Sequence, residues 1–358
     1  MPSRRSLLAL LIAARSGRAF AEVAPAAARL RFPADFGAHP ATRTEWWYVT
    51  GALDAGERTW GFQVTFFRVP TSLAGAETSR FKAKQVLFAH AAVSDLAEAR
   101  LRHDQRIARA GFGIAEASTA DTAVVLDGWR LSRSDAGGAS LYTAHAASES
   151  AGFAIDLVLA ASAPVLLQGD SGWSRKGPRP EQFSRYYSEP QLATRGTLAL
   201  DGRSFAVEGK AWLDHEWSDA YLDPAAAGWD WIGINLDDGG ALMAFRIRRA
   251  DGSTLWSGGS HRLRAGSARS FADGEVVFTP GRTWTSPATR ARYPVEWQVA
   301  TPIGTFGVRA LFDNQELDSR ASTGTIYWEG LSLLLDAGGR RVGRGYLELT
   351  GYAARLVL

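Results

Sequence analysis

A two-residue alternation of apolar and polar side chains runs through much of this sequence and limits the folds that it can adopt. One such run, residues 59–68, has apolar residues at every second position: Trp60, Phe62, Val64 and Phe66. The same period recurs in 153–159 and 243–248. Because successive side chains of a strand point to opposite faces, this period predicts strands with one buried face.

Asp-Gly pairs punctuate these runs. They occur at 127–128, 201–202, 238–239, 251–252 and 273–274. Between alternating segments, Asp-Gly favours a tight hairpin, because the turn requires positive φ. Many short strands joined by close turns predict an antiparallel β-barrel or β-sandwich.

Two segments depart from this pattern. Residues 95–110 carry Leu96, Leu101 and Ile107 among charged residues, which predicts a surface helix. Residues 169–195 are dense in Gly, Pro, Ser and Arg, which is typical of a boundary between domains. We therefore expect one β domain at 22–190 and a second at 191–358.

The first 21 residues are expected to be an export signal. Arg4 and Arg5 precede an apolar run at 7–14, and Ala19–Phe20–Ala21 offers small residues for cleavage near Ala21. The segment 3–8 is also similar to a twin-arginine signal. These features predict a periplasmic or secreted protein.

Charge and composition exclude several classes of function. Removing residues 1–21 takes away four Arg and no acidic residue, so the formal charge falls from +3 to −1. Nucleic-acid binding requires a basic surface, which this chain then lacks. No later segment is long and apolar enough to predict a transmembrane span. The chain has no Cys, which excludes disulfides and cysteine nucleophiles.

The segment Trp212–Leu213–Asp214–His215–Glu216–Trp217 places three ionisable residues between two indole rings. In a strand, Asp214 and Glu216 share one face, and His215 and Trp217 share the other. Burial beside apolar rings shifts the pKa of such groups, as acid or base catalysis at neutral pH requires. Charged groups that satisfy one another at a barrel rim are the alternative interpretation. Which face lines a cavity stays open.

Two further clusters join acids to aromatic rings: Glu45–Trp46–Trp47–Tyr48 and Trp229–Asp230–Trp231. An aromatic core explains any one cluster alone. Three clusters together predict an apolar cavity with a few polar groups, as ligand pockets have. The expected binding residues are Glu45, Trp46, Trp47, Tyr48, Trp212, Glu216, Trp229 and Trp231.

Other catalytic patterns are weak. Gly169–Asp170–Ser171–Gly172 is similar to the nucleophile loop of trypsin-like proteases, but Trp173 stands where that family has Gly. His90 is a candidate base without the protease pattern around it, so a Gly-rich turn is the favoured interpretation. Asp214, His215 and Glu216 diverge on a strand and the other histidines are scattered, so we expect no metal ion and no cofactor.

Several ordered segments carry a family likeness. They are His39–Pro40, Glu45–Tyr48 with Gly51, 60–68, 89–95, 186–190, 209–218, 228–231 and 345–352. These segments resemble the AttH-like, lipocalin-like proteins, which include carotenoid 1,2-hydratase (hydroxyneurosporene synthase). The resemblance implies an all-β fold of two consecutive lipocalin-like (calycin) antiparallel β-barrels with few short helices, and a ligand site near their junction.

The resemblance implies a hydratase that acts on an apolar isoprenoid or lipid-like molecule. Adding water to an isolated alkene begins with protonation to a carbocation, which requires a protonated acid in a dry cavity. We expect Asp214 or Asp230 to be this acid and His215 to orient it or to activate water. Trp217 and the other indoles are expected to face the cation.

Two alternatives remain. The same cavity in a non-catalytic carrier would bind a lipid or isoprenoid and pass it to an ABC-type envelope transporter. A secreted hydrolase is the third reading, and it rests on a label used in this family, not on a motif. The expected export signal makes this chain more similar to the secreted members of the family than to the carotenoid hydratases.

Overall fold

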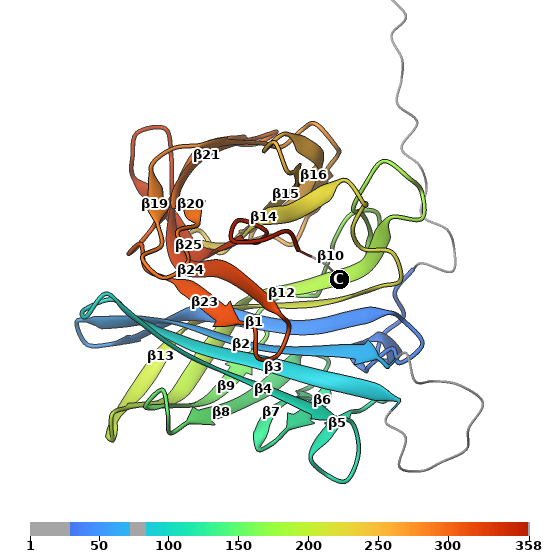
Figure 1. The fold of residues 1–358 in the computed structure, drawn as a ribbon, viewed down its shortest axis with the longest axis vertical. Coiled ribbons are helices and arrows are strands. Elements are labelled where there is room, and N and C mark those ends of the chain that lie inside the picture. Colours follow the sequence, from blue (N-terminus) through green and yellow to red (C-terminus); the bar gives the residue numbers. More distant parts are fainter. Residues whose placement is uncertain (1–28, 72–83, 357–358) are drawn as a thin grey trace, which may run out of the picture.

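The computed structural model describes residues 29–71 and 84–356 and consists of two curled β-sheets that pack against each other (Figure 1). The predicted export signal at 1–21 lies outside the described residues. The all-β fold class is confirmed, and both sheets curl into lipocalin-like, nearly closed barrels. Within the described residues, no helix is long and apolar enough to span a membrane.

The first barrel is a 13-stranded sheet ordered β4-β3-β2-β1-β13-β12-β9-β8-β7-β6-β5, with β10 and β11 paired to β12. Contacts of β5 and β6 with β3 and β4 bring its two ends together. A short 3-10 helix, η2 (Ala34–Phe36), precedes it. The strand bounds are β1 (Thr44–Ala55), β2 (Arg58–Pro70), β3 (Gln85–Asp95), β4 (Arg100–Arg109), β5 (Ala115–Ala117), β6 (Ala123–Leu126), β7 (Trp129–Asp135), β8 (Ser140–Ser148), β9 (Phe153–Ala160), β10 (Leu166–Leu167), β11 (Trp173–Arg175), β12 (Phe183–Leu200) and β13 (Arg203–Ser218).

The second barrel is a 10-stranded sheet ordered β17-β16-β15-β14-β25-β24-β22-β21-β18, with β23 paired to β24, and it carries the hairpin β19-β20. In Figure 1 it lies above the first barrel, in yellow to red. The strand bounds are β14 (Ala226–Leu236), β15 (Ala241–Arg249), β16 (Thr254–Arg262), β17 (Ala268–Phe271), β18 (Val277–Pro280), β19 (Thr283–Thr285), β20 (Arg292–Pro294), β21 (Glu296–Thr301), β22 (Gly304–Ala310), β23 (Glu316–Ser319), β24 (Thr325–Leu335) and β25 (Arg341–Leu349).

Three apolar clusters correspond to the two barrel interiors and to the layer between the barrels. Leu213 and Trp217 of β13 point into the first barrel with Trp47, whereas Trp212 points outward to a cluster shared with Trp231 of the second barrel. The second barrel has its own core around Trp328. The second half of β13, residues 211–218, is therefore buried on both faces, which explains why residues 212–217 carry large side chains.

The predicted helix at 95–110 is wrong. The segment forms the turn after β3 and then the edge strand β4, which pairs with β3 from Asp95 opposite Arg100 onward. The Asp95 carboxylate accepts hydrogen bonds from the backbone amides of Ala97 and Glu98, which closes this turn. Local turn chemistry and pairing with β3 therefore outweigh the helical spacing of the apolar residues.

The predicted domain boundary at residues 190 and 191 lies inside β12, at a β-bulge between Glu189 and Leu192. The chain passes from the first sheet to the second between Ser218 and Ala226. The Gly- and Pro-rich stretch before residue 190 forms the short strand β11 against β12 and the start of β12 itself. Its composition reflects tight turns within one sheet.

Candidate functional site

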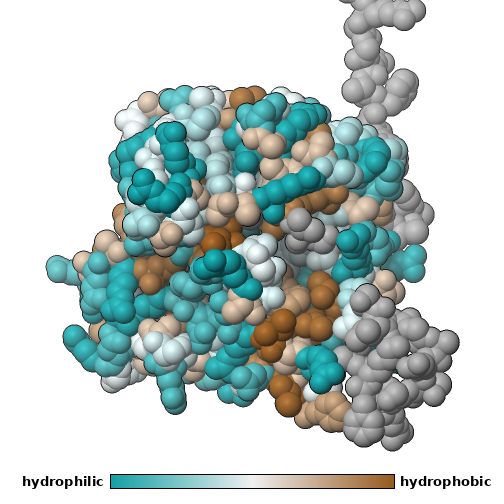
Figure 2. All heavy atoms as spheres, in the orientation of Figure 1, coloured by the Kyte–Doolittle hydropathy of each residue, from teal (hydrophilic) through white to brown (hydrophobic). Residues whose placement is uncertain are grey.

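A cavity of about 300 Å³ lies at the junction of the two barrels and is lined by side chains from both. Its walls come from β1, β2, β3, β12 and β13 of the first barrel and from β14, β15, β24 and β25 of the second. Figure 2 shows apolar surface gathered at the level where the barrels meet. The volume is at the lower end of the range typical of ligand pockets.

The pleat of β13 decides which part of the 212–217 segment faces this cavity. Asp214 and Glu216 line it, and Trp212 packs behind Asp214 in the layer between the barrels. His215 and Trp217 point to the opposite face, into the first barrel. The predicted alternation therefore holds, and the cavity lies on the Asp214 side.

The side chains of strand β1 are divided in the same way between the cavity and the first barrel. Directly opposite residues of β1 and β13 point to the same face of the sheet. Tyr48 lies opposite Asp214 and Trp46 opposite Glu216, and both line the cavity. Trp47 lies opposite His215 and Glu45 opposite Trp217, and both point into the first barrel. The four residues that were expected to bind a ligand together are thus divided between two environments.

Asp214 is buried and accepts three hydrogen bonds. Oδ2 accepts from the Tyr186 hydroxyl at 2.7 Å, and Oδ1 accepts from Ser188 Oγ at 2.5 Å and from Trp212 Nε1 at 2.6 Å. Burial raises the pKa of Asp214 to about 7, although the three donors oppose this rise. A carboxyl group of this kind exchanges a proton near neutral pH.

Glu216 forms a buried ion pair inside the cavity. Its Oε1 lies 2.9 Å from Lys176 Nζ and also accepts a hydrogen bond from Ser184. Burial raises the pKa of Glu216, and the Lys176 ammonium opposes this effect. The ammonium also lies 4.4 Å from the ring centroid of Phe245, so aromatic faces share its charge.

Two carboxyl groups of the second barrel, Glu329 and Glu348, also line the cavity. Sequence reasoning did not single out either of them as a site residue. Glu348 lay within a family segment, and Glu329 follows Trp328, an acid-beside-indole signal of the kind that identified the other clusters. Glu348 accepts a hydrogen bond from Trp229 Nε1 at 3.0 Å, and burial raises its pKa to about 7.

The remaining aromatic walls come from strands β12 and β14 and from the loop between β13 and β14. Trp229 and Trp231 of β14 line the cavity, as expected, together with Tyr186 and Tyr221. Trp231 packs edge-on against Tyr48 at 5.5 Å between ring centroids. Tyr221 packs against both Trp46 and Trp229. The rings of the two barrels thus enclose the carboxyl groups.

A chain of hydrogen bonds crosses between the barrels at one end of the cavity. Tyr327 Oη accepts from Gln63 Nε2 at 3.3 Å and lies 2.8 Å from His90 Nδ1. His90 Nε2 lies 2.9 Å from Ser322 Oγ, which donates to Gln105 Oε1 at 2.7 Å. Because the Ser322 hydroxyl proton goes to Gln105, His90 donates through Nε2 and accepts from Tyr327.

These hydrogen bonds test the hypothesis that His90 is the base for a nucleophilic Ser171. Burial lowers the pKa of His90 to about 3, so the imidazole is a neutral bridge between the barrels. Ser171 Oγ donates to Asp170 Oδ1 at 3.1 Å in an exposed turn, and His90 bonds Tyr327 and Ser322. Within the described residues, these contacts do not assemble Ser171 and His90 into a nucleophile and its base.

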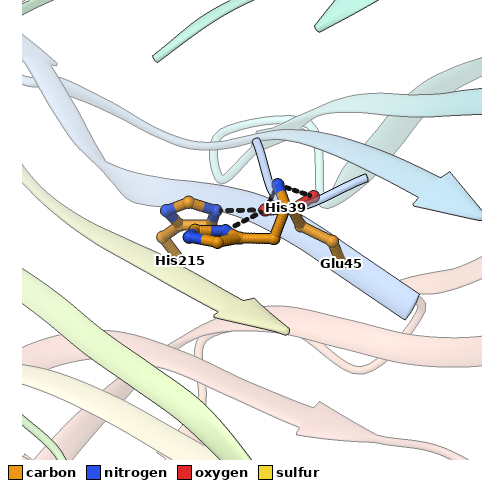
Figure 3. Close-up of side chains that lie close together, drawn as sticks. All are labelled: His39, Glu45 and His215. Carbon is orange, nitrogen blue, oxygen red and sulfur yellow. Dashed lines mark hydrogen bonds and ion pairs between the residues drawn. The ribbon is translucent and has the colours of Figure 1, made fainter. Parts of the chain in front are cut away.

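His39, Glu45 and His215 form a compact cluster inside the first barrel (Figure 3). Glu45 Oε1 lies 2.8 Å from His39 Nδ1 and 2.9 Å from His215 Nε2. Glu45 Oε2 accepts from Arg68 Nε at 2.7 Å. The imidazole of His39 stacks on Trp217 at 3.7 Å between ring centroids, and Trp47 stacks on His215 at 4.6 Å.

The electrostatics of this cluster favour a structural network. Burial alone raises the pKa of Glu45, but hydrogen bonds from His215 and His39 lower it well below its ordinary value. The potential ligand atoms of His39, Glu45 and His215 lie within 4.8 Å of one another, close enough to hold a metal ion. A bound cation would displace both imidazole hydrogen bonds and face the Arg68 guanidinium, so the donor set fits a metal poorly.

Asp230, the second acid expected to be catalytic, points into the second barrel. It lies 2.6 Å from Arg246 Nε and 3.3 Å from Arg248 Nε, and it accepts a hydrogen bond from Tyr352. Its neighbours Trp229 and Trp231 point the other way, to the cavity. Asp230 thus contributes to an interior salt-bridge network and does not line the cavity.

Comparison with known proteins gives one family and two informative structures. A family model described as AttH-like matches residues 23–352. The crystal structure of a protein assigned as AttH from Nitrosomonas europaea is 47% identical, with a TM-score of 0.83 over 90% of this chain and 97% of that chain. Kievitone hydratase from Nectria haematococca has the same fold, with 14% identity and a TM-score of 0.70 over 91% of this chain and 94% of that chain. No curated protein sequence matches.

Proposed function

The chain belongs to the AttH-like family, and on this premise we propose that it is a hydratase-type enzyme that adds water to a carbon–carbon double bond of an apolar small molecule. One observation carries the proposal. The junction cavity holds four carboxyl groups between aromatic walls, of which Asp214, Glu216 and Glu329 are buried and Glu348 is half-buried. A carrier of apolar cargo needs the rings but has no use for so many buried acids, each of which is costly to bury.

The cavity supplies what hydration of an alkene requires. Protonation of the double bond creates positive charge on carbon, and indole and phenol faces stabilise such a cation by about 0.5–2 kcal/mol each when water is excluded. A carboxyl group with a pKa near neutrality, as burial gives Asp214, transfers protons efficiently. Among the described residues, Lys176 supplies the one ammonium group that lines the cavity. It is paired with Glu216, so it destabilises the carbocation less than an unpaired ammonium group would.

The size of the cavity limits the substrate. At about 30 Å³ per water molecule, 300 Å³ corresponds to roughly ten waters. This space accommodates a small isoprenoid or lipid-like molecule, or the reacting end of a longer one such as a carotenoid. Kievitone, named as the substrate of a structural neighbour, belongs in the same test panel.

The test is incubation of the purified chain with neurosporene, squalene and kievitone in heavy-oxygen water, followed by mass spectrometry. We expect one panel member to gain a labelled hydroxyl group, and Asp214→Asn to reduce this turnover by about a hundredfold or more while retaining the substrate. Asp156→Asn, at an exposed carboxylate on the first barrel, is the control and should retain activity.

The opposite outcome is equally informative. If no compound is hydrated and native extraction recovers an unaltered apolar molecule from the protein, the chain is a carrier. A carrier would be expected to hand its cargo to an envelope transporter, as the alternative reading of the sequence proposes.

A further inference from the structure

We propose that Glu329 donates the proton in this hydration site, that Glu348 is its cross-strand partner, and that Asp214 is the base that takes a proton from the attacking water. This inference rests on the proposed function. It assigns separate roles to carboxyl groups that come from different barrels.

The backbone register places Glu329 and Glu348 side by side. Strands β24 and β25 are antiparallel, and Glu329 lies directly opposite Glu348 in their pairing. Directly opposite residues share one face of a sheet with Cβ atoms about 4.5–5.5 Å apart, and two like charges there repel each other. Glu329 is buried, Glu348 is half-buried, and both line the cavity. Two carboxyl groups in this position favour sharing one proton.

The hydrogen-bond partners decide which of the two holds the proton. Glu348 accepts from Trp229, as an ionised carboxylate does. Among the described residues, neither carboxyl oxygen of Glu329 has a hydrogen-bond partner. An ionised carboxylate without donors is the more costly state to bury, so Glu329 is the neutral member. Its pKa is raised well above the ordinary value by burial and by the charge of Glu348, and the nearby Tyr48 hydroxyl only partly opposes this rise.

The hydrogen-bond donors around Asp214 favour the ionised form of its carboxyl group. Both of its oxygens accept hydrogen bonds, from Tyr186, Ser188 and Trp212. Three donors favour the carboxylate, which acts as an acceptor for the proton of a water molecule. The two groups therefore suit complementary tasks, although both are carboxyl groups in one cavity.

Two more unpartnered polar atoms mark where a polar ligand group or water binds. Tyr48 Oη and Gln63 Oε1 are buried without hydrogen-bond partners among the described residues, and both side chains line the cavity. The Tyr48 hydroxyl of β1 acts directly on the Glu329 carboxyl group, and Gln63 lies on β2, which contacts β24 across the junction. Buried polar atoms are rarely left unsatisfied, so a bound water or substrate hydroxyl is expected beside Glu329.

The reaction balances with these groups alone. The alkene π electrons take the proton of Glu329 and form a C–H bond, which leaves a carbocation and the Glu329 carboxylate. The oxygen of water attacks the cation, and Asp214 takes the released proton. Glu348 feels the charge of Asp214 and acts on Glu329, and in this proposal it returns the proton to Glu329.

The first test needs no substrate. Infrared difference spectra at neutral pH, in water and in deuterium oxide, report the C=O stretch of un-ionised carboxyl groups. We expect the Glu329→Gln variant to lose such a band that Asp214→Asn retains. Glu189→Gln removes a buried carboxyl group outside the cavity and serves as the matched control. Retention of every band in Glu329→Gln would overturn the assignment.

The second test separates the two roles with the panel compound that the wild type hydrates. In deuterium oxide, Asp214→Asn should still exchange deuterium into recovered alkene, because protonation and its reversal need only Glu329. Glu329→Gln should lose both exchange and hydration by about a hundredfold or more, with an unchanged or higher melting temperature. The reverse pattern would overturn these roles and leave the hydratase in place. Absence of hydration by the wild type would overturn the proposed function itself.

Discussion

Nε2 of His215 lies 2.9 Å from Oε1 of Glu45 inside the first barrel, whereas Asp214, the preceding residue, faces the cavity between the barrels. Adjacent residues of β13 thus belong to two separate networks. One network joins the N-terminal segment to the first barrel through His39, and the other joins the two barrels around a cavity. Substitutions of these neighbours should therefore have different consequences.

Replacement of His215 by Ala should destabilise the fold. The change leaves one hydrogen bond of the buried Glu45 carboxylate unmade and opens a void beside Trp47, so we expect a loss of about 2–4 kcal/mol. Urea denaturation followed by circular dichroism measures this loss. His145→Ala is the control, because His145 pairs with an exposed carboxylate and should change stability by less than about 1 kcal/mol. An unchanged midpoint in His215→Ala would contradict a structural role.

Acidification should weaken the Glu45 network in a defined range. The pKa of Glu45 is lowered on folding, so its contribution is fully present above its ordinary value of 4.5 and is lost as the pH falls towards the folded value. The difference in unfolding free energy between the wild type and Glu45→Gln should therefore shrink from about pH 5 to about pH 3. A difference that stays constant across this range would show that Glu45 is not held ionised.

The stability contribution of His39 should change with pH in the opposite direction to that of Glu45. Although burial alone lowers the pKa of His39, hydrogen bonds to Asp35 and Glu45 raise it above 6.5. Its contribution is fully present below pH 6.5 and is lost as the pH rises through the folded value. The stability difference between the wild type and His39→Gln should therefore narrow on the alkaline side of 6.5, as measured by denaturation at a series of pH values.

Lys176 and Glu216 should show strong coupling. Lys176→Met leaves the buried Glu216 carboxylate without its cation, so we expect a loss of about 3–5 kcal/mol. The double variant Lys176→Met with Glu216→Gln removes both charges and should regain most of this loss. Denaturation of the two single variants and the double variant gives the coupling energy directly. Additive losses would show that the two charges do not depend on each other.

Ligand binding should be reported by tryptophan fluorescence. Trp229 and Trp231 line the cavity, whereas Trp297 lies in the core of the second barrel. Titration with the neutral probe N-phenyl-1-naphthylamine should quench indole emission, and Trp229→Phe should reduce this quenching. Trp297→Phe should leave the probe's quenching of the Trp229 and Trp231 emission unchanged. Equal quenching in both variants would place the probe elsewhere.

The sequence by itself determined the strand class and the division of faces. Alternation is a local property, so Asp214 and Glu216 had to share one side of β13, with His215 on the other. The family segments likewise led to the two-barrel fold. The helix expected at 95–110 failed because apolar spacing is ambiguous on an edge strand, where pairing with β3 supplies the decisive hydrogen bonds.

Only the tertiary structure decided which face forms the site. Both faces of β13 are buried over residues 211–218, one in its own barrel and one against the second barrel, so the hydrophobic pattern cannot distinguish the face that lines the cavity. The packing of the barrels brings Glu329 and Glu348 to Asp214 from distant parts of the chain. Strand pairing within each barrel brings Asp230 to Arg246 and Arg248 and Glu45 to Arg68, because a buried carboxylate requires a partner that only the assembled fold supplies.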